Sequence, residues 1–370
     1  MRTALVQEKT TDWNFSDAET SNGLHSIHSY PAKFIPQIPR RLIQNFAPPG
    51  GTGILDPFCG SGTTLVEAQA AGFTSVGIDL NPIACLISRV KTSPLPEKFL
   101  EHSARLVNKA GSITARGIPK IPNLDHWFRP EVQDILSRLT HLIADIPEAS
   151  LQDHLKVALS SIIVKVSNQD SDTRYAAVTK DVTGADVINA FRVACERLNK
   201  TKIAVATPDI PCRVLNKNTL TISSEEINVP IGLVVTSPPY PNAYEYWLYH
   251  KYRMWWLGYD PLEVKRHEIG ARAHFFKKNH HTEENFRQQM SQTFKLLGPL
   301  VMRSGHVCIV IGRSRIHGRE INNGDIILAV ARQAGFRLAE RIQRTIASNR
   351  KSFNLSFANI KQEEILVFQK

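Results

Sequence analysis

The stretch that decides the fold is GILDPFCGSGTTLVEAQAAGFTSVGIDL, residues 53–80. It opens with a short apolar run, GILDPF (53–58), which ends at the glycine-containing turn CGSG. The next segment, TTLVEAQAAG (63–72), is typical of a helix that ends at a glycine, and a second β-like run, SVGIDL (75–80), follows it. Strand, turn, helix and strand form a βαβ unit, which predicts a parallel sheet with a right-handed crossover.

Upstream of this unit, the segment HSYPAKFIPQIPRRLIQNF (28–46) runs from a loop into a helix. Its prolines favour a loop at the start, and Ile38, Leu42, Ile43 and Phe46 then recur at helical spacing. The segment therefore predicts a loop followed by a helix with one apolar face.

Downstream of the unit the apolar residues recur at helical spacing over a long stretch. The segments FRPEVQDILSRLTHLI and DHLKVALSSIIVKV both show this spacing, and a polar loop at 168–182 interrupts it. We interpret residues 95–206 as a helical insertion. Residues 27–94 and 207–370 are then the two parts of one sheet-bearing domain.

The strand pattern resumes after the insertion, most clearly in IGLVVTSP, which ends at a double proline. We predict strands at 212–222, 231–238 and 306–312, a helix at 325–334, and an antiparallel hairpin of 337–346 with 363–370. Together these segments predict an α/β fold, namely a Rossmann-like sheet with a helical insertion and a C-terminal antiparallel hairpin.

The composition of the 370-residue chain, with 42% hydrophobic residues, is that of an ordinary globular protein. Charged or polar residues interrupt every apolar run before it is long enough to cross a membrane. The first residues, MRTALVQEKTTDWNF, contain no apolar core of a signal peptide. We therefore expect a cytoplasmic protein that has no membrane partner.

The charge and the cysteines narrow the expected partners further. A formal net charge of +11 favours a polyanionic partner, because each phosphate that a protein neutralises releases counterions. The five cysteines are scattered without a C-x-x-C pair, which argues against a zinc site and against a disulfide framework. His280 and His281 are adjacent, but no third ligand is evident, so we predict no metal site.

The turn DPFCGSGTT (56–64) is the first motif that carries chemistry. Its glycines allow a ligand to approach the backbone closely, and open α/β sheets bind nucleotides at the carboxyl ends of their strands. Asp79 ends the next strand, where a carboxylate can accept both hydroxyls of a ribose. The turn lacks the G-x-x-x-x-G-K-[ST] pattern, which excludes a P-loop, and it lacks the spaced G-x-G-x-x-G of dinucleotide enzymes.

DPFCGSGTT resembles the S-adenosylmethionine-binding motif of DNA amino-methyltransferases, HSYPAKFIP resembles the motif upstream of it in that family, and GIDLNP resembles its second motif. The resemblance implies a methyltransferase sheet with S-adenosylmethionine as cofactor, its ribose at Asp79. LNKNTL places Asn218 where members of the family often carry an Asp near the adenine. The cofactor-binding residues that the resemblance implies are Lys33, Phe34, Asp56, Pro57, Phe58, Gly60, Ser61, Gly62, Thr63 and Asp79.

TSPPY (236–240) follows an apolar strand, so we expect it to face the same crevice as the first motif. The lone pair of an exocyclic amine is delocalised into the base, and methylation requires that this nitrogen be drawn toward tetrahedral geometry. The Ser237 hydroxyl and the Pro238 carbonyl, held rigid by Pro239, are suited to accept its N–H bonds. Tyr240 offers a ring face on which an extruded base can stack.

In the family that TSPPY resembles, SPPY accompanies cytosine-N4 methylation, whereas DPPY or NPPY usually accompanies adenine-N6 methylation. The resemblance therefore implies a site-specific DNA methyltransferase that transfers a methyl group directly to N4 of a flipped-out cytosine. The alternatives are an adenine-N6 enzyme, an RNA amino-methyltransferase, and a non-catalytic DNA-binding protein with a vestigial cofactor site. A cytosine-5 enzyme needs a cysteine nucleophile after a proline, but Cys212 of the Pro211–Cys212 dipeptide lies far from the SPPY loop.

Double-stranded DNA is the expected partner, a cognate restriction endonuclease is a candidate second partner, and the sequence leaves the oligomeric state open. The insertion (95–206) and a basic, irregular loop at 258–285 are the two candidates for the region that reads the target. Arginines that follow strands, Arg344 among them, are candidates for phosphate contacts. The candidate DNA-binding residues are Arg174, Asn242, Tyr244, Arg272, Lys277, Lys278 and Arg350.

Overall fold

A computed structural model of the chain describes residues 12–20, 22–47, 50–172, 174–242, 244–276, 280–346 and 362–370. Within these residues a seven-stranded sheet has the order β3-β2-β1-β4-β5-β9-β8. Its strands are β1 (Gly53–Asp56), β2 (Ser75–Asp79), β3 (Cys212–Asn216), β4 (Ile231–Thr236), β5 (Val301–Gly312), β8 (Arg337–Thr345) and β9 (Gln362–Gln369). The first five run parallel, and β9 lies antiparallel between β5 and β8. The predicted βαβ unit and terminal hairpin are confirmed.

Successive residues of the central strands point to opposite faces of the sheet, and each face is covered by different helices. Leu233 and Val235 of β4 pack with α1 (Gln37–Phe46) and α2 (Thr63–Ala70). Val234 packs instead with α12 (Glu283–Leu300) and α13 (Asn323–Gln333). A strand that is buried on both faces is apolar at every position, which is why β4 was so clear in the sequence.

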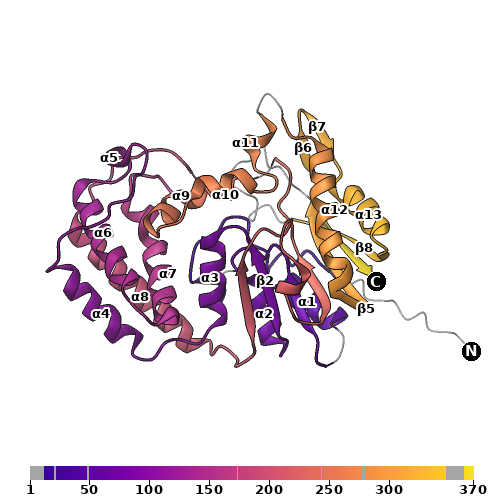
Figure 1. The fold of residues 1–370 in the computed structure, drawn as a ribbon, viewed down its shortest axis with the longest axis horizontal. Helices are drawn as coiled ribbons and strands as arrows, with labels where there is room; N and C mark the ends of the chain where they lie inside the picture. The colour runs from indigo at the N-terminus through magenta and orange to yellow at the C-terminus, as the bar shows by residue number, and fades with distance from the viewer. Residues whose placement is uncertain are drawn as a thin grey trace, which may run out of the picture.

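The predicted insertion is helical and forms a lobe beside the sheet (Figure 1). Its helices are α4 (Phe99–Ala110), α5 (Leu124–Trp127), α6 (Pro130–Ala144), α7 (Ala149–Val166) and α8 (Gly184–Ala204). The apolar core of this lobe also includes α3 (Pro82–Thr92) and α9 (Tyr246–Trp256), so the lobe packs directly on the sheet-bearing part. The division into two domains stays a prediction.

The segment that was expected to be a basic, irregular loop (258–285) contains two short helices instead, α10 (Pro261–His267) and α11 (Arg272–Phe275). Helix α10 begins where it does because the Asp260 side chain accepts a hydrogen bond from the Leu262 N–H at 2.8 Å and Pro261 occupies the first helical position. The expectation of a loop was therefore wrong over these two helices.

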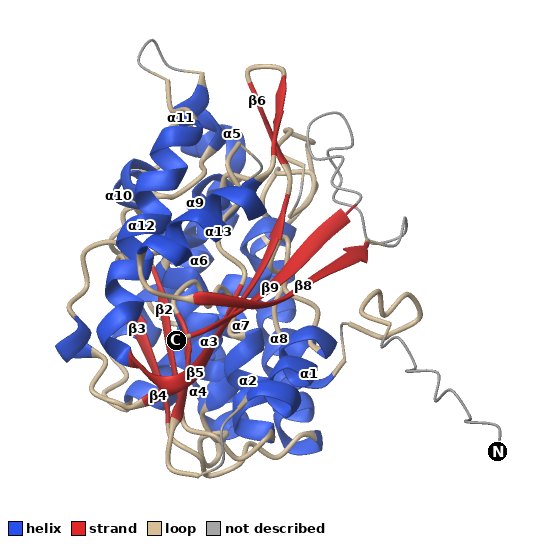
Figure 2. Cartoon of the chain, turned by 90° about the vertical axis from the view of Figure 1, so that its right-hand side faces the viewer, coloured by secondary structure: helices blue, strands red, loops and turns tan. Residues whose placement is uncertain are grey.

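Other short elements were not expected from the sequence. They are the 3₁₀ helices η1 (Gly23–Ser26) and η2 (Ser224–Glu226), and the strands β6 (Ser314–Ile316) and β7 (Arg319–Ile321). Figure 2 shows that β6 and β7 extend beyond the sheet on the side where α11 lies. In the described part of the chain, no helix combines the length and the apolar character that a membrane crossing requires.

Candidate active site

A cavity of about 250 Å³ lies at the carboxyl edge of the sheet, and both sequence motifs line it. The motifs meet there because β1, β2 and β4 are parallel neighbours, so their carboxyl ends share one edge. The lining includes the following predicted site residues: Lys33, Phe34, Asp56, Phe58, Gly60, Ser61, Thr63, Asp79, Ser237, Pro238, Pro239, Tyr240 and Tyr244. Asn218 also lines the cavity, whereas the predicted Pro57 and Gly62 do not.

The Asp56 carboxylate joins the two motifs at their base. Its Oδ1 accepts hydrogen bonds from the Thr236 hydroxyl at 2.6 Å and from the Phe58 N–H at 3.1 Å. Burial raises the pKa of Asp56 to about 6. Because this carboxylate forms hydrogen bonds with Thr236 of β4 and with the turn that follows Asp56, its main effect is to fix the strand ends that carry the two motifs.

The two glycines of the turn, Gly60 and Gly62, meet different structural requirements. Gly62 has a φ of +77°, and a Cβ there would lie 2.7 Å from the Ser88 hydroxyl oxygen of α3. Gly62 is therefore required by packing against α3, which explains why it does not line the cavity. Gly60 has a φ of +49°, and its carbonyl accepts a hydrogen bond from Ser88 at 2.8 Å, so α3 also fixes the cavity-lining part of the turn.

Asp79 lies at the cavity wall with both carboxylate oxygens oriented by the backbone. Oδ2 accepts from the Gly60 N–H at 2.9 Å, and Oδ1 accepts from the Asn81 N–H at 2.8 Å. Burial raises the pKa of Asp79 to about 6, so the carboxyl is mostly ionised at neutral pH. A carboxylate offers about four acceptor positions, so two remain for a ligand such as a ribose diol.

Lys91 supports the turn from behind and was not expected from the sequence. It is fully buried in α3, and its ammonium group donates to the Ser61 carbonyl at 2.7 Å. Burial lowers the pKa of Lys91 to about 7. No sequence pattern distinguishes this lysine from the many that lie on helix surfaces, so only its position in the fold reveals its role.

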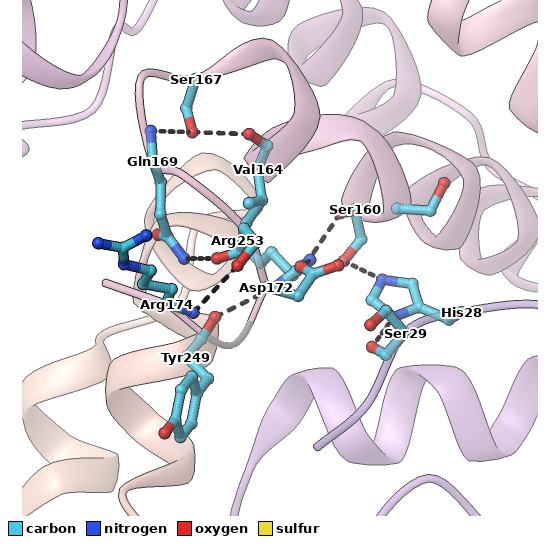
Figure 3. A network of polar contacts seen from close by, with 12 residues as sticks. His28, Ser29, Ser160, Val164, Ser167, Gln169, Asp172, Arg174, Tyr249 and Arg253 are labelled. Atoms are coloured by element: carbon cyan, nitrogen blue, oxygen red, sulfur yellow. Dashed lines mark hydrogen bonds and ion pairs between the residues drawn. The ribbon is translucent and has the colours of Figure 1, made fainter. Parts of the chain in front are cut away.

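The upstream segment that carries Lys33 is anchored to the helical lobe, as Figure 3 shows. The His28 ring bonds the Ser160 hydroxyl of α7 at 2.9 Å, and Arg253 of α9 donates to the Ser160 carbonyl at 3.0 Å. Arg253 also pairs with Asp172 in the polar loop. Burial and the neighbouring guanidinium lower the pKa of His28, which keeps its ring neutral. This network fixes the approach of the segment to the cavity.

Lys33 and Tyr30 occupy the cavity side of that segment. The Lys33 ammonium donates to the His25 carbonyl at 2.9 Å, and burial lowers its pKa. The Tyr30 ring stacks on His250 and Tyr246 with centroid distances of 4.9 and 5.9 Å. Tyr30 and Tyr246 line the cavity although the sequence had not marked them as site residues.

The Ser237–Tyr240 loop is held by residues from other parts of the chain. The Tyr240 hydroxyl donates to Glu363 Oε1 at 2.9 Å, and the second oxygen of Glu363 pairs with Arg344. The side chain of Arg344 is only 5% exposed, so its expected contact with phosphates was wrong. Gly270 packs so closely on the loop that a Cβ would lie 2.6 Å from the Tyr240 carbonyl oxygen.

Glu268 also lines the cavity, two residues before the glycine that packs on the Ser237–Tyr240 loop. Its carboxylate accepts from the backbone N–H groups of Tyr246 and Trp247 at 2.7 and 2.8 Å and thereby fixes the start of α9. Burial raises the pKa of Glu268 to about 8. Neither Glu268 nor Gly270 carries a local motif that the sequence could have revealed, because their partners are set by the fold.

The candidate DNA-binding residues are scattered. Arg174 is exposed and lies 3.8 Å from Asp170, and the Asn242 amide donates to the Arg315 carbonyl of β6 at 2.8 Å. Arg272 lies over the Phe276 ring at 5.6 Å. Lys277, Lys278 and Arg350 lie outside the described residues. Of the set, Tyr244 lines the cavity.

The sequence that carries these motifs is similar to a protein-family model and to known methyltransferases. A family model described as DNA methylase matches residues 4–89 and 231–370. The Type II methyltransferase M.MvaI of Kocuria varians is 29% identical over 252 residues, which are 62% of this chain and 56% of that protein. The Type II methyltransferase M.BsoBI of Geobacillus stearothermophilus is 26% identical over 290 residues, with coverage of 67% and 55%. The chain thus spans about half the length of these two relatives.

Proposed function

Because this chain belongs to the DNA methylase family, we propose that it is a site-specific DNA methyltransferase whose target is the N4 amino group of cytosine. The observation that supports this most strongly is the cavity whose wall contains both Asp79 and the Ser237–Tyr240 loop. A methyl donor held at one wall and a base held at the other would face each other across the cavity. The similar proteins are named Type II methyltransferases, which supports a role beside a restriction endonuclease.

S-adenosylmethionine is the cofactor of this family, and the residues of the cavity fit it. Asp79 provides acceptors for the ribose hydroxyls, and Lys33 provides an ammonium group for the methionine carboxylate. Phe58 and Leu80 add apolar surface for the adenine. When bound, the cofactor supplies an electrophilic methyl group.

The chain's own contribution is to orient the amine of the base. The Ser237 hydroxyl and the Pro238 carbonyl are acceptors that can hold its two N–H bonds and so direct the nitrogen lone pair toward the donor. Two consecutive prolines restrict the backbone of the loop, which keeps the carbonyl in place. Tyr240 offers its ring face to the base. Direct transfer then requires positioning and no covalent intermediate with the protein.

Cytosine is proposed as the target because the first residue of the motif is serine. The choice rests on the resemblance of TSPPY to the SPPY motif, which accompanies cytosine-N4 methylation in the family, whereas DPPY or NPPY usually accompanies adenine-N6 methylation. Methylation at adenine N6 would show that the choice of base is wrong, but it would leave the proposed mechanism unchanged.

We further propose that the helical lobe reads the target sequence. The family model matches the chain on both sides of the lobe but not within it, so the matched residues leave the lobe free to make sequence-specific contacts with base edges. The exposed Arg174 in the polar loop of this lobe is one candidate contact, and the net charge of +11 favours double-stranded DNA as the substrate.

The test is nucleoside mass spectrometry of DNA and RNA incubated with the protein and isotope-labelled S-adenosylmethionine, beside a Ser237→Ala control. Labelled N4-methylcytosine in DNA, lost in the control, is the expected result. Labelled N6-methyladenine would correct the target base. Cofactor binding without label in any nucleic acid, or label in RNA alone, would contradict the proposed function.

A further inference from the structure

The Tyr240 ring is held by an ion pair from the C-terminal hairpin. Its hydroxyl donates to Glu363 Oε1 at 2.9 Å, and Glu363 Oε2 pairs with the Arg344 guanidinium. Arg344 and Glu363 are direct cross-strand partners on β8 and β9, with side chains 5% and 15% exposed. All three side chains line the cavity.

Arg344 is itself fixed by the N-terminal segment. Its Nε donates to the Trp13 carbonyl at 3.1 Å and its Nη2 to the Asn14 carbonyl at 3.4 Å. The Asn14 side chain accepts in turn from the Thr345 N–H at 2.6 Å. Since the planar guanidinium is bonded on several sides, it holds Glu363 in one position, and Glu363 holds the phenol.

A structural role alone does not explain this pair well. Two buried charges lose their hydration, and a pair of this kind adds little net stability compared with apolar side chains of the same size. In the neighbouring pair of Arg341 with Glu364, at 2.9 Å, the arginine is 31% exposed and neither residue lines the cavity. Because consecutive strand residues point to opposite faces, Glu363 and Glu364 serve different sides of the same strand.

We propose that Glu363 and Arg344 are positioning residues that fix the Tyr240 ring in the orientation in which it stacks on the target base. The proposal rests on the proposed function, since it assigns a purpose to a ring that the methylation chemistry needs. Without the pair, the ring rotates about its side-chain bonds, and the base loses its fixed plane relative to the methyl donor.

The experiment compares five proteins in single-turnover methyl transfer: wild type, Tyr240→Phe, Glu363→Asp, the double variant, and Glu364→Gln. Tyr240→Phe removes the hydroxyl, and with it the contacts of the phenol with Glu363 and with the Ser237 side chain. Glu363→Asp keeps the charge opposite Arg344, so the protein is expected to fold, but its carboxylate is one methylene too short to reach the phenol. Glu364→Gln is the matched control on the same strand.

Tyr240→Phe and Glu363→Asp are each expected to lower the transfer rate by about tenfold, with the dissociation constant of the cofactor unchanged. The double variant is expected to match Tyr240→Phe within about twofold, because Tyr240→Phe already lacks the contact with Glu363. Glu364→Gln should behave like wild type. Multiplicative losses in the double variant, or an equal loss in Glu364→Gln, would overturn the proposal.

A second measurement judges the inference even if the protein transfers no methyl group to DNA. In protein with isotope-labelled tyrosine, the Tyr240 hydroxyl proton should exchange slowly with water and give a nuclear magnetic resonance signal, assigned by its absence in Tyr240→Phe. The signal should persist in Glu364→Gln and disappear in Glu363→Asp. Persistence in Glu363→Asp would refute the positioning role, whereas an inactive wild type that shows the expected pattern would refute only the proposed function.

Discussion

The two walls of the cavity are supported in different ways. On the cofactor side, Asp79 bonds Gly60 and Asn81, contacts made within one βαβ unit. On the base side, the SPPY loop is held by Gly270 and Glu363, which lie 30 and 123 residues beyond Tyr240. Residues that contact each other within one βαβ unit can be recognised as a short sequence motif. Contacts between residues far apart in the sequence can be identified only from the folded structure. If this contrast also holds in function, substitutions on the two walls should differ in their effects on methyl transfer and on cofactor binding.

The largest effect is expected for Ser237→Ala, which removes a proposed acceptor for the amine without touching the cofactor side. The rate of methyl transfer should fall by about 100- to 1,000-fold, the range found when a preorganised polar contact to a reacting group is removed. Calorimetry with S-adenosylhomocysteine should give an unchanged affinity. A variant that retains most of the wild-type rate would remove Ser237 from the mechanism.

Gly270→Ala tests the distant support of the loop. The added Cβ would approach the Tyr240 carbonyl oxygen to 2.6 Å, and a displacement of the loop by about 1 Å can cost about 100-fold in rate. Gly258→Ala is the matched control, because its φ of +81° is as unfavourable as the +72° of Gly270 but no atom lies within 4 Å of its Cβ. Equal rates in the two variants would mean that backbone strain, and not contact with Tyr240, causes the loss.

Asp79→Asn tests the local support and carries a pH dependence. The ionised carboxylate accepts the ribose hydroxyls best, so cofactor affinity should fall as the pH drops through about 6, the raised pKa of Asp79. The variant should bind about tenfold more weakly at pH 8, with a flatter pH profile. Asp56 titrates in the same range, and the difference between wild type and variant isolates Asp79.

The pKa of Asp79 also predicts the sign of a stability effect. Because folding raises this pKa above its ordinary value, the folded state retains the proton over a range where the unfolded chain has lost it. The contribution of Asp79 to the free energy of unfolding is therefore fully present at low pH and is lost as the pH rises through about 6. Urea unfolding of wild type and Asp79→Asn at pH 4 and pH 7 measures it, and a difference of the opposite sign would contradict the assignment.

The smallest effect on catalysis is expected for Asp172→Asn in the network of Figure 3. The variant removes the charge opposite Arg253, which is buried, and should lower the stability by about 1–2 kcal/mol, since Asp172 itself is partly exposed. The rate should stay within about twofold of wild type. Asp170→Asn, in an exposed pair with Arg174, is the control and should shift the urea midpoint much less.

The sequence was sufficient for the parts of the fold that depend on local pattern. The strand β4 could be recognised from its continuous run of apolar residues, and the turn after β1 from its glycine motif. Helix α12 was missed although its Thr282 cap, reinforced by Asn285, was a usable signal. Helix α9 was missed for a physical reason, since its aromatic residues are buried on several sides and show no single apolar face.

Only part of the candidate site could be predicted from the sequence. The residues of both motifs could be predicted, because parallel strands bring their carboxyl ends to one edge. Lys91 could not, because nothing in the sequence distinguishes it from lysines on helix surfaces, and Glu268 and Glu363 could not, because their partners lie on other elements of the fold. Arg344 was a candidate for phosphate contacts, and only the register of β8 with β9 shows that it lies opposite Glu363.

The most direct test of the account is a crystal structure of the protein with S-adenosylhomocysteine. The ribose is expected on Asp79, the methionine carboxylate beside Lys33, and the sulfur atom facing the Ser237–Tyr240 loop across the cavity. A ligand bound elsewhere, or one whose sulfur faces away from Ser237, would contradict the claim that the two motifs form one site for methyl transfer.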